Sequence, residues 1–216
     1  MNYLAETIIE NAAYWQEKWQ DGECESVKNN RGNCIDEIKK QFGKEILNTP
    51  WCAEFVSVVV KTACEKLGIQ NLLPFTRSTA AMLDGAIKNG LRVDSTPAVG
   101  SIFYRKRDGG GHVGIVVKIT SAGIVTIEGN SNDAVLGRSY SFTEIASWKF
   151  IHIEELGGAG LVRFAFRDGV PTGLWVGSLI VASVGGLWYY NKKHPILPEK
   201  LGLNDADRSK WDSTNY

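Results

Sequence analysis

The sequence predicts an α+β protein, in which N-terminal helices pack on an antiparallel sheet and a C-terminal apolar helix follows. Through residues 1–90, apolar side chains recur at the spacing of one helix face. After Pro97, short segments rich in Val, Ile and aromatic residues alternate with glycine-rich turns, which is typical of hairpins. Helices followed by strands are the order of an α+β fold. Near the C-terminus, residues 169–191 carry no charge.

Periodicity and capping signals predict four helices before Pro97. They span residues 1–20, 34–42, 51–67 and 78–89. The third helix has the sharpest start, because Thr49 is a suitable N-cap and Pro50 suits a first position where no N–H is needed. The β-branched run at 56–60 would also suit a strand, but the capping signals and the length favour a helix.

Four strands are expected after these helices. They span residues 101–104, 112–119, 123–128 and 148–153. Glycine-rich turns at 108–111 and 121–123 would join neighbouring strands into hairpins.

The uncharged stretch near the C-terminus predicts a transmembrane helix. A helix over 169–191 rises ~35 Å, which exceeds the ~30 Å of a bilayer core. Aromatic residues flank it, and Lys192 and Lys193 follow at once. The expected organisation is an N-terminal helix at 1–22, a catalytic domain at 23–156, a glycine-rich linker at 157–172, the candidate membrane helix at 173–191 and a polar tail at 192–216.

Composition excludes some functions. Lysine plus arginine and aspartate plus glutamate number 24 each, so a basic nucleic-acid binder is disfavoured. The cysteines, four in all, form no CxxC pair, which disfavours a zinc ribbon or a thioredoxin motif. The first residues lack the basic and apolar regions of a signal peptide, so a cytosolic start with reduced thiols is expected. Cys24 and Cys34 could pair, but this expected origin favours free thiols.

Cys52 is the first candidate for chemistry. It falls near the start of the third predicted helix, where free N–H groups and the helix dipole favour an anion, so its thiol pKa is expected to fall. A thiolate is the nucleophile that acyl transfer needs. The alternative is a buried structural cysteine, which is a common fate of this residue type.

His112 and the segment Glu128-Gly129-Asn130 complete the candidate site. His112 follows three glycines at a strand start and can act as a general base, although a surface turn histidine would look the same. Glu128 or Asn130, at the end of the next strand, can accept the other imidazole N–H and set the tautomer. The sequence leaves open which of the two does so, and an ordinary turn remains the alternative.

These motifs together resemble one family. Pro-Trp-Cys-Ala-Glu-Phe-Val, Gly-His-Val-Gly-Ile-Val and Ile-Glu-Gly-Asn, in this order, are similar to the CHAP family (cysteine, histidine-dependent amidohydrolase/peptidase) of the papain-like NlpC/P60 group. Asn29-Asn30-Arg31-Gly32 and residues 97–103 resemble its phage and prophage branch. The resemblance covers roughly residues 25–155; one departure is Gly100-Ser101, where many relatives carry Gly-Asp.

The resemblance implies a papain-like fold and hydrolysis of an amide bond in peptidoglycan, by amidase or endopeptidase action. Cys52 would attack the carbonyl, His112 would carry the proton, and Glu128 or Asn130 would orient His112. The backbone N–H of Cys52 would contribute to an oxyanion hole. Trp51 and Tyr104 are candidates for the wall of the substrate groove. No metal or other cofactor is implied.

Other residues of these types have plainer interpretations. His152 is a second possible base, but it has no glycine approach and acids follow it. His194 lies outside the domain, and Cys64 suits core packing on the helix of Cys52. The run Arg105-Lys106-Arg107 reads as a solvated tip that could also touch anionic wall polymers.

Two readings of the whole chain compete. In the first, a peptidoglycan hydrolase is tethered by the helix at 173–191 with its catalytic domain on the wall side, or is carried in a phage particle or injection apparatus. In the second, a CHAP-like domain is a structural or assembly component, with the apolar helix as a protein–protein plug and homo-oligomers as one outcome. Peptidoglycan is the expected partner in the first, and nucleic acid in neither.

Overall fold

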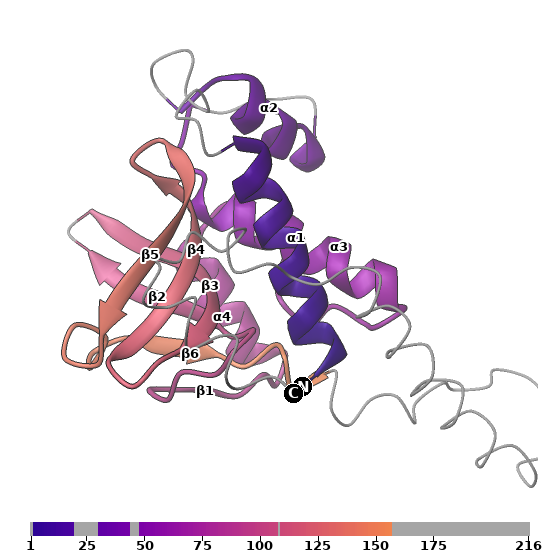
Figure 1. The fold of residues 1–216 in the computed structure, drawn as a ribbon. Coiled ribbons are helices and arrows are strands. Elements are labelled where there is room, and N and C mark those ends of the chain that lie inside the picture. The colour runs from indigo at the N-terminus through magenta and orange to yellow at the C-terminus, as the bar shows by residue number, and fades with distance from the viewer. Residues whose placement is uncertain (1, 20–29, 44–47, 108, 157–216) are drawn as a thin grey trace, which may run out of the picture. The chain divides into compact units, whose positions relative to one another are not determined.

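The computed structural model describes residues 2–19, 30–43, 48–107 and 109–156, which all belong to one compact unit, residues 1–159 (Figure 1). The predicted linker, membrane helix and tail at 157–172, 173–191 and 192–216 lie outside the described residues. Among the described helices, none is long and apolar enough to span a membrane.

The predicted helices are present with shifted ends. They are α1 (Tyr3–Trp19), α2 (Asn33–Lys39), the short 3₁₀ helix η1 (Lys40–Phe42), α3 (Cys52–Leu67) and α4 (Thr79–Lys88). The segment expected as one helix at 34–42 therefore divides into α2 and η1. The start of α4 is as predicted, because the Ser78 side chain accepts a hydrogen bond from the Ala81 N–H.

Helix α3 starts later than the sequence suggests. Its N-cap is Trp51, whose carbonyl accepts the first helical bond from the Phe55 N–H at 2.9 Å. Thr49 is not the cap: its carbonyl accepts a hydrogen bond from the Lys39 ammonium at 2.7 Å. Cys52 is thus the first residue of the helix.

A single antiparallel sheet follows the helices. Its strands are β1 (Val93–Asp94), β2 (Ile102–Arg107), β3 (Gly110–Ile119), β4 (Gly123–Ser131), β5 (Ala134–Ser141) and β6 (Lys149–Ile151), in the order β1-β6-β2-β3-β4-β5. Strands β1 and β5 were not predicted from the sequence. Strand β1 is too short for a pattern, and the sequence of β5, AVLGRSYS, lacks the apolar alternation that marks a strand.

The two faces of the sheet are covered differently. Helices α1 and α3 lie on one side of it (Figure 1), and Gly129 of β4 faces α3, where a Cβ would come within 2.5 Å of Phe55. Successive residues point to opposite faces of a strand, so Glu128 faces away from α3. On that side lies a second core cluster of Phe103, Val116, Ile124, Ile145, Trp148 and Phe150, with Tyr140 packed against it.

A buried ionic group joins α2 to α3. The Lys39 ammonium lies 3.5 Å from one carboxylate oxygen of Glu54, and Arg77 donates to the other at 2.9 Å. Lys39 and Glu54 are fully buried. Burial lowers the pKa of Lys39 and raises that of Glu54, while their mutual attraction opposes both shifts. The group fixes the segment that leads into the start of α3.

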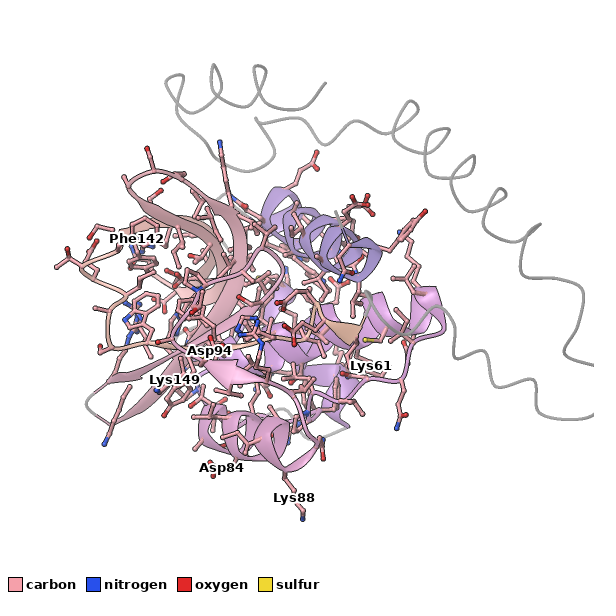
Figure 2. The ribbon with its side chains drawn as sticks, turned by 90° about the horizontal axis from the view of Figure 1, so that it is seen from below. Lys61, Asp84, Lys88, Asp94, Phe142 and Lys149 are labelled. Atoms are coloured by element: carbon pink, nitrogen blue, oxygen red, sulfur yellow. The ribbon has the colours of Figure 1, made fainter. Side chains whose placement is uncertain are left out.

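Charged residues line the exterior. Asp84 and Lys88 lie on the exposed side of α4 and point away from the body of the domain (Figure 2). The opposite side of this helix buries Met82 and Ala86. Helix α4 therefore shows the amphipathic pattern that predicted it.

One expectation about the thiols is wrong. Cys34 is disulfide-bonded, whereas Cys52 and Cys64 are free. Cys34 was expected to be unpaired because the first residues suggested a reducing compartment. The first residues do not indicate which cysteines lie close together in the fold.

Candidate active site

The Cys52 sulfur lies where two strands of the sheet separate. In β3, the Val116 N–H pairs with β2 through the Ser101 carbonyl, so by alternation the N–H groups of Val113 and Ile115 point toward β4. Pairing between β3 and β4 begins at Ile115 and Ile127, which leaves the Val113 N–H without a strand partner. This N–H is within hydrogen-bonding reach of the Cys52 sulfur.

The thiol of Cys52 is less acidic than its place at a helix start suggests. Burial raises its pKa above the ordinary value, since only 4% of the residue is exposed. The backbone N–H groups of Val113, Ala53 and Cys52 itself lower the pKa but do not offset burial, and the Glu128 carboxylate raises it further. The prediction of a lowered pKa is therefore wrong, because desolvation outweighs the free N–H groups.

His112 and Glu128 form a buried pair on β3 and β4. The Nε2 atom of His112 lies 2.7 Å from Oε2 of Glu128, and the exposed fractions of the two residues are 3% and 0%. The imidazole also packs beside Phe103, with ring centroids 5.9 Å apart. The Cys52 sulfur is within reach of the N–H of Val113, the residue after His112, and the Glu128 charge acts on its thiol, so the three residues lie around the same part of β3.

The surroundings of Glu128 keep it a carboxylate. Burial acts to raise its pKa, but hydrogen bonds from His112, Thr126 and Tyr140 outweigh burial, and the pKa lies below its ordinary value. The Thr126 hydroxyl donates to Oε1 at 2.7 Å. An ionised carboxylate only accepts hydrogen bonds, so Nε2 of His112 carries the proton and the lone pair of a neutral imidazole is on Nδ1. That nitrogen is then the one able to take a proton.

Two glycines make this packing possible. A Cβ at Gly114 would lie 2.8 Å from the Glu128 side chain and 2.6 Å from Phe103. A Cβ at Gly111 would lie 2.7 Å from the Tyr104 ring. Real Cβ atoms do not approach other atoms so closely, so the strand that carries His112 needs glycine on both sides of it.

The remaining predicted residues differ in their surroundings. Asn130 has a left-handed backbone, with φ of 57°, at an irregularity of β4 between Glu128 and Ser131. Of the two residues proposed to orient His112, the geometry therefore brings Glu128 to it. Tyr104 is half-buried beside Gly111, and its place in a groove wall stays a prediction. Trp51 is fully buried and packs against Gly129, so its ring offers no surface to a substrate, and the groove-wall assignment does not hold for it.

Sequence reasoning missed three residues that contact Glu128. They are Thr126, Tyr140 and Arg105, which lie on β4, β5 and β2. Thr126 had a usable signal, because it stands two residues before Glu128 and shares its face of the strand. Tyr140 and Arg105 come from strands whose registers the sequence does not reveal.

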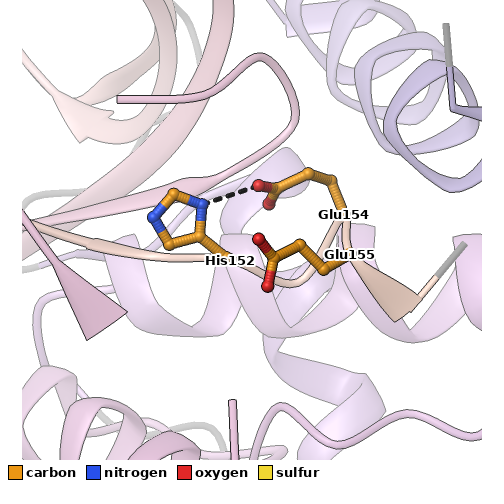
Figure 3. Close-up of side chains that lie close together, drawn as sticks. All are labelled: His152, Glu154 and Glu155. Carbon is orange, nitrogen blue, oxygen red and sulfur yellow. Dashed lines mark hydrogen bonds and ion pairs between the residues drawn. The ribbon is translucent and has the colours of Figure 1, made fainter. Parts of the chain in front are cut away.

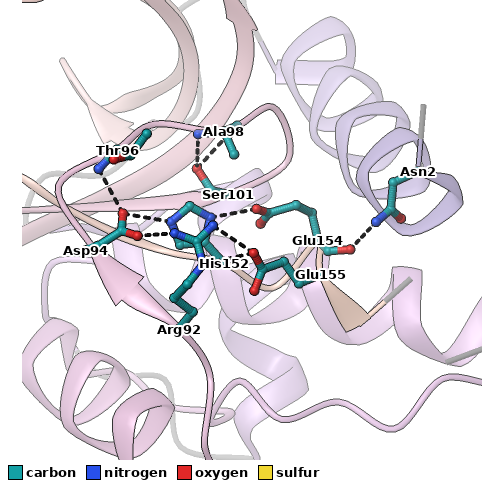
Figure 4. Close-up of polar contacts among 9 residues, drawn as sticks. All are labelled: Asn2, Arg92, Asp94, Thr96, Ala98, Ser101, His152, Glu154 and Glu155. Carbon is teal, nitrogen blue, oxygen red and sulfur yellow. Dashed lines mark hydrogen bonds and ion pairs between the residues drawn. The ribbon is translucent and has the colours of Figure 1, made fainter. Parts of the chain in front are cut away.

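A second cluster of ionisable groups surrounds His152. His152, Glu154 and Glu155 each bring one ligand-type atom within 4.8 Å of the others (Figure 3). The Nδ1 atom of His152 lies 2.7 Å from Glu154, and its Nε2 atom lies 3.0 Å from Asp94 (Figure 4). Both ring nitrogens are thus occupied, so His152 is not available as the alternative base.

This cluster fits an ion-pair network better than a metal centre. Arg92 pairs with Asp94 and, at 2.7 Å, with Glu155, so a cation already balances these carboxylates (Figure 4). The Thr96 N–H and then His152 lower the pKa of Asp94 to about 2. The Asn2 side chain also donates to the Glu154 carbonyl. The network therefore ties the start of α1 and strand β1 to the end of β6.

A hollow of about 530 Å³ lies away from these groups. It is lined by Lys61, Cys64, Glu65, Ile69, Asn71, Leu73, Pro74, Phe75 and Asn89. Cys64 is buried there, and burial raises its thiol pKa to about 11. Such a thiol stays protonated at neutral pH, which agrees with the packing role expected of it.

The segment that holds the candidate site matches a known protein family. Residues 45–130 match the family model of the CHAP domain. No curated protein and no solved structure matches the chain. The matched segment holds Cys52, His112, Glu128 and Asn130, whereas α1, β5 and β6 lie outside it. A CHAP domain indicates a hydrolase of the cysteine/histidine amidase or peptidase type, and the resemblance of this chain to the CHAP domain family is confirmed over residues 45–130.

Proposed function

We propose that the protein is a peptidoglycan hydrolase that cleaves an amide bond with Cys52 as nucleophile and His112 as general base. One observation carries the proposal: the Cys52 sulfur lies beside the strand of His112, whose Nε2 atom is held by Glu128 at 2.7 Å. This is a nucleophile, a base and an orienting carboxylate in the order that acyl transfer requires.

Because the pKa of Cys52 is raised, the proposed reaction starts from a neutral thiol. A neutral thiol must lose its proton as it attacks, and Nδ1 of His112 takes that proton while sulfur bonds to the amide carbon. The imidazolium then donates the proton to the leaving amine as the C–N bond breaks. Water, deprotonated by His112, attacks the thioester, which releases the acid and restores the thiol.

The start of α3 supplies charge stabilisation. Backbone N–H groups of the first helical turn have no partner within the helix, and those of Cys52 and Ala53 lie within reach of the sulfur. They are placed to donate to the oxyanion that forms on the attacked carbonyl. Removing one such donor from a hydrolase typically costs ~100-fold or more in kcat.

Clearing of purified cell walls tests the proposal. We expect the wild-type protein to lower the turbidity of a wall suspension and Cys52→Ala to lose this activity. Cys64→Ala is the matched control, because Cys64 is a free, buried thiol on the same helix. The proposal fails if wild type clears no wall among several chemotypes, or if Cys52→Ala is as active as wild type. Either result would favour the alternative hypothesis, in which the CHAP-like domain is a structural or assembly component.

The bond cleaved distinguishes two activities that share this machinery. Amidase action separates the stem peptide from the glycan, whereas endopeptidase action cuts within the peptide or its cross-bridge. Mass spectrometry of the released muropeptides identifies the new termini and so separates the two.

A further inference from the structure

Arg105 is held by aromatic rings instead of reaching into solvent. It belongs to a basic run on β2 in which Lys106 and Arg107 are exposed, yet only 19% of the Arg105 side chain is exposed. Its guanidinium carbon lies 5.2 Å from the ring centroid of Tyr140 and 5.1 Å from that of Trp148. Both distances suit cation–π contacts, which favour an arginine over a lysine.

The Arg105 guanidinium also faces the carboxylate that holds His112. The Nη2 atom of Arg105 lies 4.0 Å from Oε2 of Glu128, the same oxygen that His112 contacts. The Tyr140 hydroxyl hydrogen-bonds to both Arg105 and Glu128. A guanidinium can only donate and a carboxylate can only accept, so the hydroxyl accepts from Arg105 and donates to Glu128.

The ionisable groups around Glu128 come from four elements. They are Arg105 on β2, His112 on β3, Tyr140 on β5 and Cys52 on α3, and Glu144 faces Arg105 from the segment after β5. Burial raises the pKa of Tyr140, so its hydroxyl stays neutral. In the proposed reaction Cys52 and His112 change charge. Among these groups, Arg105 is the one that stays positively charged throughout the proposed reaction.

We propose that Arg105, packed against Tyr140 and Trp148, is a positioning residue that holds the Glu128 carboxylate against Nε2 of His112, both directly and through the Tyr140 hydroxyl. Its consequence for catalysis rests on the proposed function. A buried carboxylate that loses a neighbouring cation is protonated more readily. A protonated Glu128 no longer demands the Nε2 proton, and His112 then loses the tautomer whose Nδ1 accepts the proton of Cys52.

Three single substitutions of the full-length protein test this role. Arg105→Gln removes the charge, Arg105→Lys keeps it without the planar guanidinium, and Lys106→Gln makes the same charge change at the exposed neighbour on β2. Two readouts are needed: the pH profile of kcat and KM for wall hydrolysis, and the pKa of Glu128 from a ¹³C carboxyl NMR titration. A melting curve for each variant establishes that it is folded.

For Arg105→Gln, we expect the pKa of Glu128 to rise by about one unit, the effect of losing an opposite charge at this range. The acid side of the kcat profile should move to higher pH by a similar amount, with KM changed less than about twofold. The loss should therefore grow as the pH falls toward the pKa of Glu128 and should be small at about pH 8. Arg105→Lys should keep the Glu128 pKa close to its wild-type value, and Lys106→Gln should leave the Glu128 pKa and the pH profile of kcat as in wild type.

Two outcomes would overturn the inference. One is a folded Arg105→Gln protein whose Glu128 titrates as in wild type, and the other is a loss of kcat that is equal at every pH. The NMR titration needs no substrate. If wild type fails to hydrolyse walls, the proposed function falls, while the shift of Glu128 still decides whether Arg105 holds that carboxylate.

Discussion

At the scale of single residues, burial decides the chemistry of the site. Cys52 lies at a helix start with free N–H groups, yet its pKa is raised because the sulfur is almost removed from water. Glu128 is buried as well, but hydrogen bonds to its charged form hold its pKa below the ordinary value. The pKa values of Cys52 and Glu128 are thus shifted in opposite directions. The raised pKa keeps the thiol neutral, and the lowered pKa keeps the carboxylate charged.

The lowered pKa of Glu128 predicts a pH-dependent contribution to stability. This carboxyl binds a proton less readily in the folded than in the unfolded chain, so it stabilises the fold above its unfolded pKa. The contribution is lost as the pH falls through the folded pKa, which lies below 4.5. Urea unfolding of wild type and Glu128→Gln should therefore differ most at about pH 7 and converge toward about pH 3.

A matched control separates this effect from general acid destabilisation. Glu65→Gln changes an exposed carboxylate of α3 in a surface pair with Lys61, and surface pairs contribute ~0–1 kcal/mol. Its difference from wild type should stay small at each pH. A Glu128→Gln protein whose difference from wild type grows as the pH falls would contradict the shift in Glu128.

At the scale of elements, the start of α3 is fixed from outside the helix. The Lys39 ammonium binds the Thr49 carbonyl just before α3 and pairs with Glu54 in its first turn. Arg77, from the segment before α4, completes the group. Helix α2 thereby helps to position Cys52, the proposed nucleophile, although neither Lys39 nor Glu54 takes part in the proposed reaction.

Removing Lys39 should destabilise the domain strongly. In Lys39→Met, Glu54 stays buried with one cation fewer, and breaking a buried pair from one side costs about 3–5 kcal/mol. Lys40→Met is the control, because Lys40 is exposed on η1. Urea unfolding midpoints provide the measurement. Equal stability of the two variants would show that the buried group contributes little to the fold.

At the scale of the whole molecule, the two ends of the described unit are joined. The Asn2 side chain binds the Glu154 carbonyl, and the network around His152 ties β1 to the segment after β6 (Figure 4). The proposed tether at 173–191 comes after this closed unit in the sequence. The catalytic unit and the tether are therefore separable by experiment.

A chain shortened to residues 1–159 should unfold cooperatively at the temperature of the same unit in the full chain. It should also keep the wall-clearing activity proposed above. If 173–191 spans a bilayer, the full chain should partition into a detergent phase and the shortened chain should stay in water. Equal partitioning of the two proteins would refute the membrane helix.

The sequence alone determined the α+β order, the helices, four strands close to their observed positions, and a candidate set of Cys52, His112 and either Glu128 or Asn130. These depend on local signals, such as periodicity, capping residues and glycine turns. Only the tertiary structure decided that Glu128 and not Asn130 contacts His112, and that burial raises the pKa of Cys52. It also decided that Arg105 packs against Tyr140 and Trp148, whereas the basic residues that follow it on β2 are exposed. Strand register and desolvation depend on residues far apart in the chain, so no local pattern encodes them.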